Sequence, residues 1–568
     1  RLVRFTDAMS NLVSYVYDRN GNMTRAVFLG ELNDSTGSSS NVRLAEQRWT
    51  YDELNRLTET RELFFDPVTQ SPFGDGASVT KFAYAPNGDC TSVTDDNGHV
   101  IRYAYDTAGR LASVTDPKTN MMSLGYDAAG NLTSMVSSER SDITPGTTLF
   151  SRSFAYDALG RCVQTVDNVG NTNSWSYDSP GRVRRSKLGR ELRITFHDDL
   201  NRPIIAIGDL DGDGAPDLAA DVNTSWTYDD NSRCVSVTDD NTNTTYTVYD
   251  SLDRPIQIIN ADGTACNLIW SPRSNLLRQQ DPNGNVISNR YDLLDRLVAR
   301  DITPGSTVAS TTTFERYAYD GRSQLVAATN DVSHSELDYD SMGNCRGNHT
   351  DGWNLLQAFD SVGNTISVTY PSGLTIGYTY DACDQVTQIN RCEGCGNPWL
   401  GDLVAAYAYD GPGRVGRITR PNGINTRISW DGLTGTPNAS GDFGWRQVNG
   451  INHQVAGGGA IIDRRIAKFD RNQNRLERSQ IAPFIQNGPL TTNTWTYDPL
   501  SRATESTLFR NNSLASKSYI LDGNGNRQIV LSNGLAQPYV MDATPLPGAA
   551  DFQMNQYTVT PFAMQTYD

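Results

Sequence analysis

The chain has 568 residues, of which 37% are hydrophobic. Its mean hydropathy of −0.50 is too low for strands that are buried on both faces, and it favours sheets with one solvated face. The 48 basic and 65 acidic residues give a net charge of −17 and a pI near 4.8, and such an acidic surface repels phosphate backbones, which argues against nucleic-acid binding as the main role. No segment approaches the roughly 20 apolar residues that a membrane-spanning helix needs.

One short phrase recurs along the chain about every 21 residues, as in Tyr105-Asp106-Thr-Ala-Gly109-Arg110-Leu111. We call each copy of the aromatic-Asp pair, or a close substitute for it, a stamp. A register of this kind predicts a repeat protein, here one continuous array of about 21 repeats over residues 1–568. The stamps begin at residues 17, 51, 84, 105, 126, 156, 177, 196, 228, 249, 270, 291, 319, 339, 359, 380, 409, 430, 469, 497 and, in a degenerate form, 521.

Each stamp predicts the loop of a β-hairpin. The aromatic residue ends a strand, the Asp side chain bonds the following backbone as an Asx-turn, and the Gly supplies a positive φ before the return strand starts. A second turn lies between stamps, for example at Asp281-Pro282-Asn283-Gly284-Asn285, so each repeat holds two strands. Aromatic residues at a spacing of two share one face of the sheet, and we expect them to stack on those of neighbouring repeats.

The number of strands limits how they can be arranged. About 21 repeats of two strands, spaced roughly 4.8 Å apart, make a ribbon on the order of 200 Å long. About eight strands already close into a barrel that side chains can fill, so this ribbon must spiral, stack on itself or enclose space. The fold class predicted from the residues is therefore all-β, a long antiparallel strip of hairpin repeats.

The stamp and its many copies resemble the YD-repeat proteins, also called Rhs-repeat proteins, which include bacterial polymorphic toxins, the shell component of insecticidal toxin complexes and the animal teneurins. The resemblance implies a strip wound into a hollow shell or spiral, which encapsulates a C-terminal effector in the toxins and is a rigid extracellular body in teneurins. Toxin-bearing members usually close with segments resembling Asp-Pro-x-Gly-Leu and Gly-x-Asn-x-Tyr-x-Tyr, which do not occur here. We therefore expect any effector, with its release chemistry, to lie outside this sequence.

The two ends of the sequence each carry half of a stamp. The chain begins with Arg1-Leu2-Val3, the second half of the phrase, and stops at Tyr567-Asp568, the first half. We expect from this that the chain was cut from a longer protein at both ends.

An acidic segment at residues 208–221 interrupts the repeats and is expected to be a loop inserted between strands. Asp209, Asp211, Asp213 and Asp217 fall at positions 1, 3, 5 and 9 of a calcium-type loop, and the carbonyl of Ala215 falls at position 7. This oxygen-rich spacing is typical of Ca²⁺ loops and resembles those of FG-GAP-type repeats more than a full EF-hand, because position 12 is Ala220, although Asp221 follows. The alternative is an acidic, solvated turn, in which the carboxylates would repel one another without a cation.

Three of the eight cysteines, Cys383, Cys392 and Cys395, lie near one another around a C-x-x-C. Zinc, a local disulfide or free thiols are all conceivable, and a disulfide or free thiols are favoured over zinc because three ligands do not complete a tetrahedral site. Most of the other cysteines stand where other repeats place Leu or Val and are expected to be small apolar side chains. The segment 431–468 breaks the register, is rich in Gly and Asn, and is expected to be an irregular insertion that forms a plug, an inter-turn contact or an exposed loop.

The five histidines stand in no recognisable catalytic phrase, and paired carboxylates such as Asp95-Asp96 occupy turns, where Asp caps backbone amides. We therefore expect no enzyme, although a glycosidase would need only two suitably spaced carboxylates. The sequence favours the structural shell of a secreted or cell-surface protein, most readily a bacterial one, that encloses or carries a C-terminal cargo. The alternative is an extracellular adhesion or filament-forming scaffold that associates with itself or with a cell-surface partner.

Overall fold

The computed structural model describes residues 1–34, 40–306, 308, 312–394, 399, 401–432, 442–481, 491–510, 513–540 and 560. These residues form 44 strands, and no α-helix occurs among them. Every strand pairing that the structure shows is antiparallel and joins neighbours in sequence, as for β12 (Thr147–Tyr156) and β13 (Cys162–Asp167). The predicted fold class, an all-β strip of hairpin repeats, is confirmed.

The chain divides into two compact units, and each of them contains two separate stretches of the strip. Unit 1 comprises Arg1–Met122 and Ile269–Ala408, and unit 2 comprises Ser123–Leu268 and Tyr409–Asp568. In each unit we call the earlier residues the first stretch and the later residues the second stretch. The sequence predicted one continuous array and gave no sign of this division.

The strands of unit 1 come from both of its stretches. Those of the first stretch are β1 (Arg4–Thr6), β2 (Leu12–Tyr17), β3 (Met23–Gly30), β4 (Val42–Tyr51), β5 (Leu57–Phe65), β6 (Pro72–Tyr84), β7 (Cys90–Thr94), β8 (Val100–Tyr105) and β9 (Leu111–Thr115). Those of the second stretch are β23 (Leu276–Gln280), β24 (Val286–Tyr291), β25 (Leu297–Thr303), β26 (Phe314–Tyr319), β27 (Leu325–Asn330), β28 (His334–Tyr339), β29 (Cys345–Thr350), β30 (Trp353–Phe359), β31 (Thr365–Thr369), β32 (Leu374–Tyr380) and β33 (Val386–Glu393).

Unit 2 is built in the same way. Besides β12 and β13, its first stretch holds β11 (Leu132–Arg140), β14 (Thr172–Tyr177), β15 (Val183–Leu188), β16 (Glu191–His197), β17 (Pro203–Gly208), β18 (Val222–Tyr228), β19 (Cys234–Thr238), β20 (Thr244–Tyr249) and β21 (Pro255–Ile259). Its second stretch holds β35 (Val415–Thr419), β36 (Ile424–Trp430), β37 (Val448–Val455), β38 (Ile461–Phe469), β39 (Arg475–Ile481), β40 (Thr491–Tyr497), β41 (Ala503–Arg510), β42 (Ser513–Leu521), β43 (Arg527–Ser532) and β44 (Leu535–Pro538). The boundaries between the units fall within β10 (Met121–Tyr126), β22 (Ala265–Trp270) and β34 (Asp402–Tyr409).

With one exception, the even-numbered strands from β2 to β42 end at the first residue of a stamp, as the sequence predicted. One stamp is displaced by a residue, because β16 ends at His197 rather than at the expected Phe196. The ladder shifts at the stamp: Ala155 pairs with Gln164, whereas Tyr156 pairs with Cys162. This β-bulge recurs at most stamps and increases the local twist of the strip.

Two other expectations concern the segments between stamps. Residues 209–221 connect β17 to β18, and Gly208 is the last residue of β17. Residues 431–468, expected to be irregular, instead contain β37 and most of β38, which pair with each other as an ordinary hairpin. The run Gly457-Gly458-Gly459 lies in the turn of this hairpin, and residues 433–441 lie outside the described part of the chain.

The fourth turn residue has a positive φ in most stamps and in many of the second turns, but it is not always glycine. Gly160 has a φ of 73°, and Ser501 at the same position has a φ of 64°. The non-glycine residues at this position are Ser10, Asn55, Thr119, Asn201, Ser232, Thr242, Asp253, Ser274, Asp295, Ser323, Asp384, Gln473 and Ser501. The turn therefore imposes the left-handed conformation on residues that disfavour it.

Thr242 provides a direct test, because a β-branched residue is among the least suited to its φ of 68°. We expect Thr242→Gly to stabilise this turn by roughly 0.5 to 1 kcal/mol, the relief of the left-handed strain less the added chain entropy of glycine. Hydrogen exchange of the amides of Thr242 and Asn243 measures the change. The reciprocal variant Gly263→Thr, at the same turn position with a φ of 86°, should destabilise its own turn, and equal signs for the two variants would contradict this explanation.

Candidate functional site

The Asp of a stamp holds its own turn with both carboxylate oxygens. Asp157 Oδ1 accepts hydrogen bonds from the amides of Leu159 (2.9 Å) and Arg161 (3.0 Å), and Asp157 Oδ2 accepts one from Arg161 Nε (2.7 Å). The Arg161 amide, together with the Arg161 guanidinium, lowers the pKa of Asp157 below its usual value. The two bonds from the arginine, through its amide and its Nε, also form in the stamp turns that begin at Asp52, Asp106, Asp178, Asp198, Asp229, Asp250, Asp292 and Asp498.

Asparagine replaces this arginine in many turns. Asn171 Nδ2 donates to Asp167 Oδ2 at 2.9 Å, and the Asn171 amide donates to Asp167 Oδ1 at 2.9 Å. An amide thus satisfies the second carboxylate oxygen without adding a charge. Asparagine can also reach the next stamp turn, since Asn22 Nδ2 donates to Asn55 Oδ1 at 2.8 Å and Asn364 Nδ2 donates to Asp384 Oδ1 at 2.9 Å.

The arginine connects neighbouring stamps. The Arg161 guanidinium lies over the ring of Tyr177, 4.6 Å from its centroid, and Arg161 Nη1 donates to the carbonyl of Asp178 at 3.4 Å. The Tyr177 hydroxyl donates back to the carbonyl of Cys162 at 2.7 Å. Equivalent arginine–tyrosine pairs join Arg56 to Tyr84, Arg202 to Tyr228, Arg233 to Tyr249 and Arg296 to Tyr319.

This contact differs from the aromatic stacking that the sequence predicted. Two ring pairs of the structure are Phe64 with Phe73 and Phe150 with Trp445, and none of these four rings is a stamp aromatic. A cation over the face of the ring occupies the position that was expected to hold a second ring in these repeats. The signal was present in the sequence, because Arg stands four residues after the stamp Asp in many of the copies.

In each unit the two stretches meet along a seam between two different edges of the strip. We call the edge that carries the stamp turns the stamp edge, and the edge that carries the second turns the turn edge. At every seam contact described below, the turn edge of the first stretch meets the stamp edge of the second stretch. The contacting residues are 262 to 285 positions apart in most pairs, for example Arg296 with Asp34 and Asn524 with Asp239.

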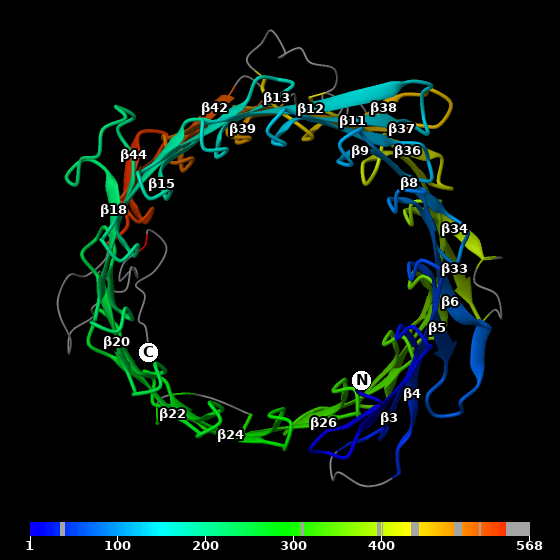
Figure 1. Ribbon diagram of the computed structural model, residues 1–568. Coiled ribbons are helices and arrows are strands. Elements are labelled where there is room, and N and C mark those ends of the chain that lie inside the picture. The colour runs from blue at the N-terminus through cyan, green and yellow to red at the C-terminus, as the bar shows by residue number, and fades with distance from the viewer. Residues whose placement is uncertain are drawn as a thin grey trace. The chain divides into compact units, whose positions relative to one another are not determined.

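The seam of unit 1 combines backbone hydrogen bonds with ion pairs. The amide of Asp34 donates to the carbonyl of Tyr319, where the turn after β3 meets the end of β26 (Figure 1). Ser341 Oγ accepts from the amide of Phe65 at 2.8 Å. Lys118 Nζ lies 2.8 Å from Asp381 Oδ2, and this ion pair, largely shielded from solvent, lowers the pKa of Asp381 despite the opposing effect of burial.

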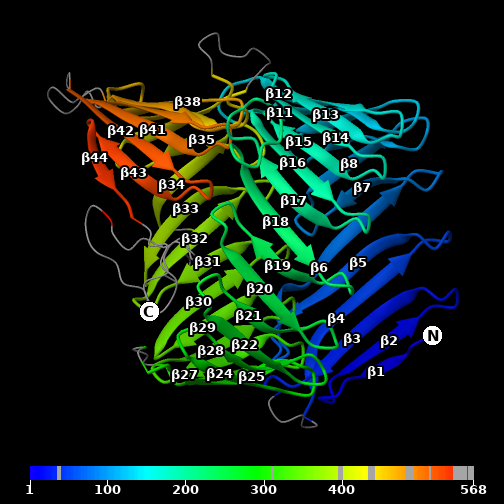
Figure 2. The same cartoon turned by 90° about the vertical axis from the view of Figure 1, so that its left-hand side faces the viewer.

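The seam of unit 2 follows the same rule. Figure 2 shows β12 and β13 beside β38 in the upper part of the structure. Asn168 Nδ2 donates to the carbonyl of Gly432 at 2.8 Å, and Arg471 Nη1 donates to the carbonyl of Gly170 at 2.7 Å. Further along, Asn241 Nδ2 donates to Asp522 Oδ2 at 2.8 Å.

A buried charge cluster lies within the seam of unit 2. Glu139, which is 4% exposed, pairs with Arg414 and with Arg446, whose Nη2 lies 2.5 Å from Glu139 Oε1. Both guanidiniums lie over the ring of Phe150, at 4.6 and 4.4 Å from its centroid. Removing one partner would leave an uncompensated buried charge, which is strongly destabilising.

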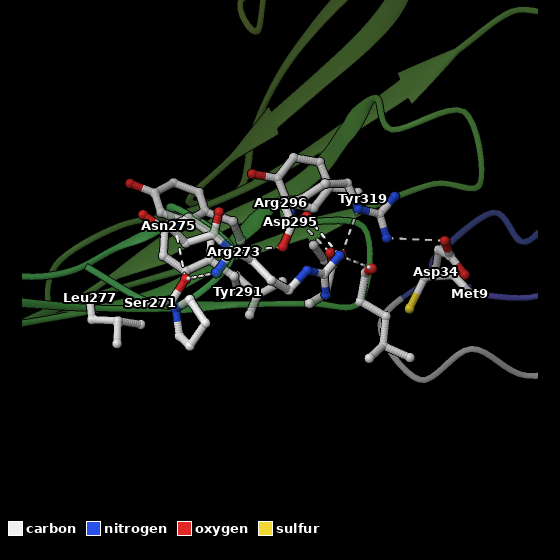
Figure 3. Close-up of a pocket in the computed structure, with 16 residues that line it drawn as sticks. Met9, Asp34, Ser271, Arg273, Asn275, Leu277, Tyr291, Asp295, Arg296 and Tyr319 are labelled. Carbon is white, nitrogen blue, oxygen red and sulfur yellow. Dashed lines mark hydrogen bonds and ion pairs between the residues drawn. The ribbon is translucent and has the colours of Figure 1, made fainter. Parts of the chain in front are cut away.

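A pocket of about 780 Å³ lies in unit 1, where the first stretch begins to cover the stamp turns of the second (Figure 3). Its walls are the stamp residues Tyr291 and Tyr319 with the neighbouring Arg273 and Arg296, and Met9 and Asp34 close one end. Arg296 is fully engaged: its Nε lies 2.6 Å from Asp292 Oδ2 and its Nη2 lies 3.0 Å from Asp34 Oδ2. The charged groups that line this pocket therefore already bind partners within the stamp edge and across the seam.

The acidic loop brings together a set of carboxylates that differs from the predicted one. Oxygens of Asp209, Asp211 and Asp221 lie within 4.8 Å of one another, and this is the group of potential metal ligands found among the described residues. Asp213 and Asp217 do not belong to this group; their Oδ1 atoms accept the amides of Ala215 and Ala219. Asp221, which the sequence placed just after position 12, is the added member.

The buried carboxylates of this loop already have backbone donors. Asp209 accepts the amides of Gly212 and Gly214, and Asp221 accepts those of Leu210 and Asp217. Hard carboxylate oxygens suit Ca²⁺, and exposed Asp211 completes the group. Calcium binding by the predicted residues, including the Ala215 carbonyl, stays a prediction.

The two arrangements make different predictions for calcium titration by calorimetry. If the grouped carboxylates bind the ion, Asp211→Ala should weaken binding by about tenfold or more, whereas Asp213→Ala should leave it nearly unchanged. The linear spacing predicts that both variants lose affinity. Absence of binding at millimolar calcium would reduce the loop to an acidic turn closed by its own Asp side chains.

The structure separates the three cysteines that were considered together. Cys392 is disulfide-bonded, whereas Cys383 is a free thiol whose pKa is raised to about 12, chiefly by burial. Cys395 lies outside the described residues. The expectation that no zinc binds at Cys383, Cys392 and Cys395 stays a prediction.

Sequence reasoning missed one pair of acids, Asp431 and Asp442. Burial raises the pKa of Asp431 to about 6, and the neighbouring Asp442 carboxyl contributes in the same direction. Asp442 Oδ1 accepts the amide of Phe469 at 2.9 Å. The pair joins the start and end of a connection in the strip, and no motif in the sequence marks it.

Comparisons with known proteins agree with this structure. Residues 84–121, 224–265 and 359–391 match the RHS repeat family model. These three regions are therefore similar to RHS repeats, as the stamps predicted. No curated protein sequence matches the chain significantly.

Solved structures with a similar fold come from toxin complexes. The chain is similar to TcdB2-TccC3 (TM-score 0.54, 12% identity, covering 94% of this chain and 36% of that one) and to a Photorhabdus luminescens Tc holotoxin pore with a TccC3 mutation (0.53, 11%, 95% and 43%). It is also similar to TcdB2-TccC3-Cdc42 (0.50, 10%, 96% and 44%). The chain spans less than half of each of these longer chains, and the likeness concerns the fold. Among the described residues no helix is long and apolar enough to cross a membrane.

Proposed function

We propose that this chain is a non-catalytic structural shell segment of a secreted or cell-surface Rhs-repeat protein, most readily a bacterial one, that encloses or carries a C-terminal cargo. The observation that carries the proposal is the seam, where two stretches of one strip lock edge to edge through hydrogen bonds and ion pairs such as Lys118 with Asp381. Within each unit these contacts join the two stretches into one packed body, which supports a structural role.

Two further observations support the proposal. The fold is similar to that of TcdB2-TccC3 structures over 94% of this chain. The disulfide at Cys392 is typical of proteins that leave the reducing cytosol. The hydrogen bonds and ion pairs of the stamp turns and of the seams order the backbone, which fits a structural role.

Protection of a cargo tests the proposal. We expect an unstructured peptide fused after Asp568 to be cleaved by a protease at least about tenfold more slowly than the same peptide inserted between Gly457 and Gly458. The Gly457 turn is exposed, so the second fusion reports cleavage without protection. Equal cleavage rates for the two fusions would contradict enclosure and favour the rigid adhesion or filament scaffold.

A further inference from the structure

Three arginines form a row across neighbouring strands in the second stretch of unit 2. Arg417 of β35 lies directly opposite Arg427 of β36. Asn452 of β37, the strand between β36 and β38 in Figure 1, lies opposite both Arg427 and Arg464 of β38. Arg427 stands three positions before the stamp residue Trp430, so the row lies on the sheet face opposite to the stamp aromatics. We call Arg417, Arg427 and Arg464 the arginine row.

The positive charge of the arginine row is not compensated within the described part of unit 2. All three side chains are exposed or partly exposed, and among the described residues none of their guanidiniums has a hydrogen bond or an ion pair. The strands β35 to β39 contain two acidic residues: Asp463 lies on the other face, and Glu477 is already bound by Lys468 at 2.9 Å. The connecting segments 433–441 and 482–490 contain no Asp or Glu. Like charges directly opposite one another destabilise a sheet, so the row is costly in a chain that is otherwise acidic.

Unit 1 contains the same arrangement with its charge compensated. Arg25 of β3 lies directly opposite Arg48 of β4, which also stands three positions before its stamp residue. Glu46 binds both arginines: Arg25 Nε and Arg48 Nη2 lie 2.8 and 2.7 Å from Glu46 Oε1. Burial would raise the pKa of Glu46, but the hydrogen bonds from these guanidiniums and from that of Arg43 lower it to about 2. A carboxylate is therefore the group that compensates such a pair of arginines in this strip.

Asparagine replaces this glutamate in the second stretch of unit 2. Asn425 of β36 stands five positions before its stamp residue, as Glu46 does in β4. The Asn425 Oδ1 atom is buried and accepts no hydrogen bond from the described residues. A neutral amide adds no negative charge, so the arginine row keeps the guanidiniums of the unit 1 arrangement without its carboxylate.

We propose that the arginine row binds the carboxylates of an extended acidic segment of a partner protein. A row on an open sheet face fits an extended peptide, whose alternate side chains project to one side about 6.6 to 6.8 Å apart. Guanidiniums bind carboxylates with two parallel hydrogen bonds, which gives such a contact direction as well as charge.

Single-stranded nucleic acid fits this surface less well than an acidic peptide. Its bases need aromatic side chains on which to stack, and the rings of β35 to β38, those of Trp430 and Phe469, lie on the other face. The net charge of −17 also repels a long phosphate backbone. The arginine row requires no enclosed cargo, so the proposal is independent of the proposed function.

Fluorescence anisotropy of a labelled peptide of ten glutamates tests the proposal on the full chain at about 50 mM salt, where exposed charges are weakly screened. The unmodified chain should bind this peptide with a Kd of about 1 to 100 µM. Asn425→Glu should weaken binding at least about tenfold, because the new carboxylate occupies the guanidiniums as Glu46 does in unit 1. The same variant should raise the melting temperature, which separates loss of binding from unfolding.

Asn267→Glu is the matched control, because Asn267 is an exposed strand residue three positions before its own stamp residue, on the same sheet face but in the first stretch. This control should bind the peptide like the unmodified chain, whereas Arg417→Gln with Arg464→Gln should lose affinity as Asn425→Glu does.

Four results would overturn the proposal. They are no binding by the unmodified chain up to about 100 µM, equal affinity in Asn425→Glu, equal loss in Asn267→Glu, and binding of a ten-nucleotide oligothymidine as tightly as the peptide. The third result would mean that the overall charge decides, and the fourth that the surface recognises nucleic acid.

Discussion

The carboxylate of the stamp Asp is the interaction on which the rest of this structure depends. A hairpin strip with few fully buried side chains cannot obtain its order from a large core. In the turn after β12, Asp157 binds two amides and a guanidinium, and so fixes the bulge, the positive φ and the start of the return strand together. The buried backbone groups of each turn are satisfied locally, which makes one repeat largely self-sufficient.

Order then passes from one repeat to the next through arginine and tyrosine. Asp157 holds Arg161 Nε while the Arg161 guanidinium lies over the Tyr177 ring, and the Tyr177 hydroxyl donates to the Cys162 carbonyl. The strip is thus a chain of nearest-neighbour contacts, as expected for a repeat array. The seam adds long-range contacts, because it joins repeats that are far apart in sequence and buries charges such as Glu139 between them.

The sequence was sufficient for the local structure and insufficient for the seam. The stamp predicted the strand end, the Asx-turn and the return strand, because these depend on residues within five positions. The sequence analysis misplaced one stamp, because His197 replaces the usual aromatic residue there. It also overestimated the need for glycine at the fourth turn position, because Thr242 and Ser501 adopt a positive φ there as well. The pairing of Lys118 with Asp381 could not be predicted, because nothing local specifies which distant edge a turn will meet. The acidic loop is intermediate: spacing identified Asp209 and Asp211, but folding of the loop brings Asp221 beside them.

Hydrogen exchange in the variant Asp157→Ala tests the central role of the stamp carboxylate most directly. If that carboxylate holds its own turn and, through Arg161, the next one, the amides of Gly160 and Arg161 should exchange at least about tenfold faster, and the amide of Arg182 in the next stamp should follow. Exchange near Arg254 should not change, and the exposed Asp230→Ala serves as the control. Unchanged protection at Arg161 and Arg182, or loss of protection throughout unit 2, would contradict this account.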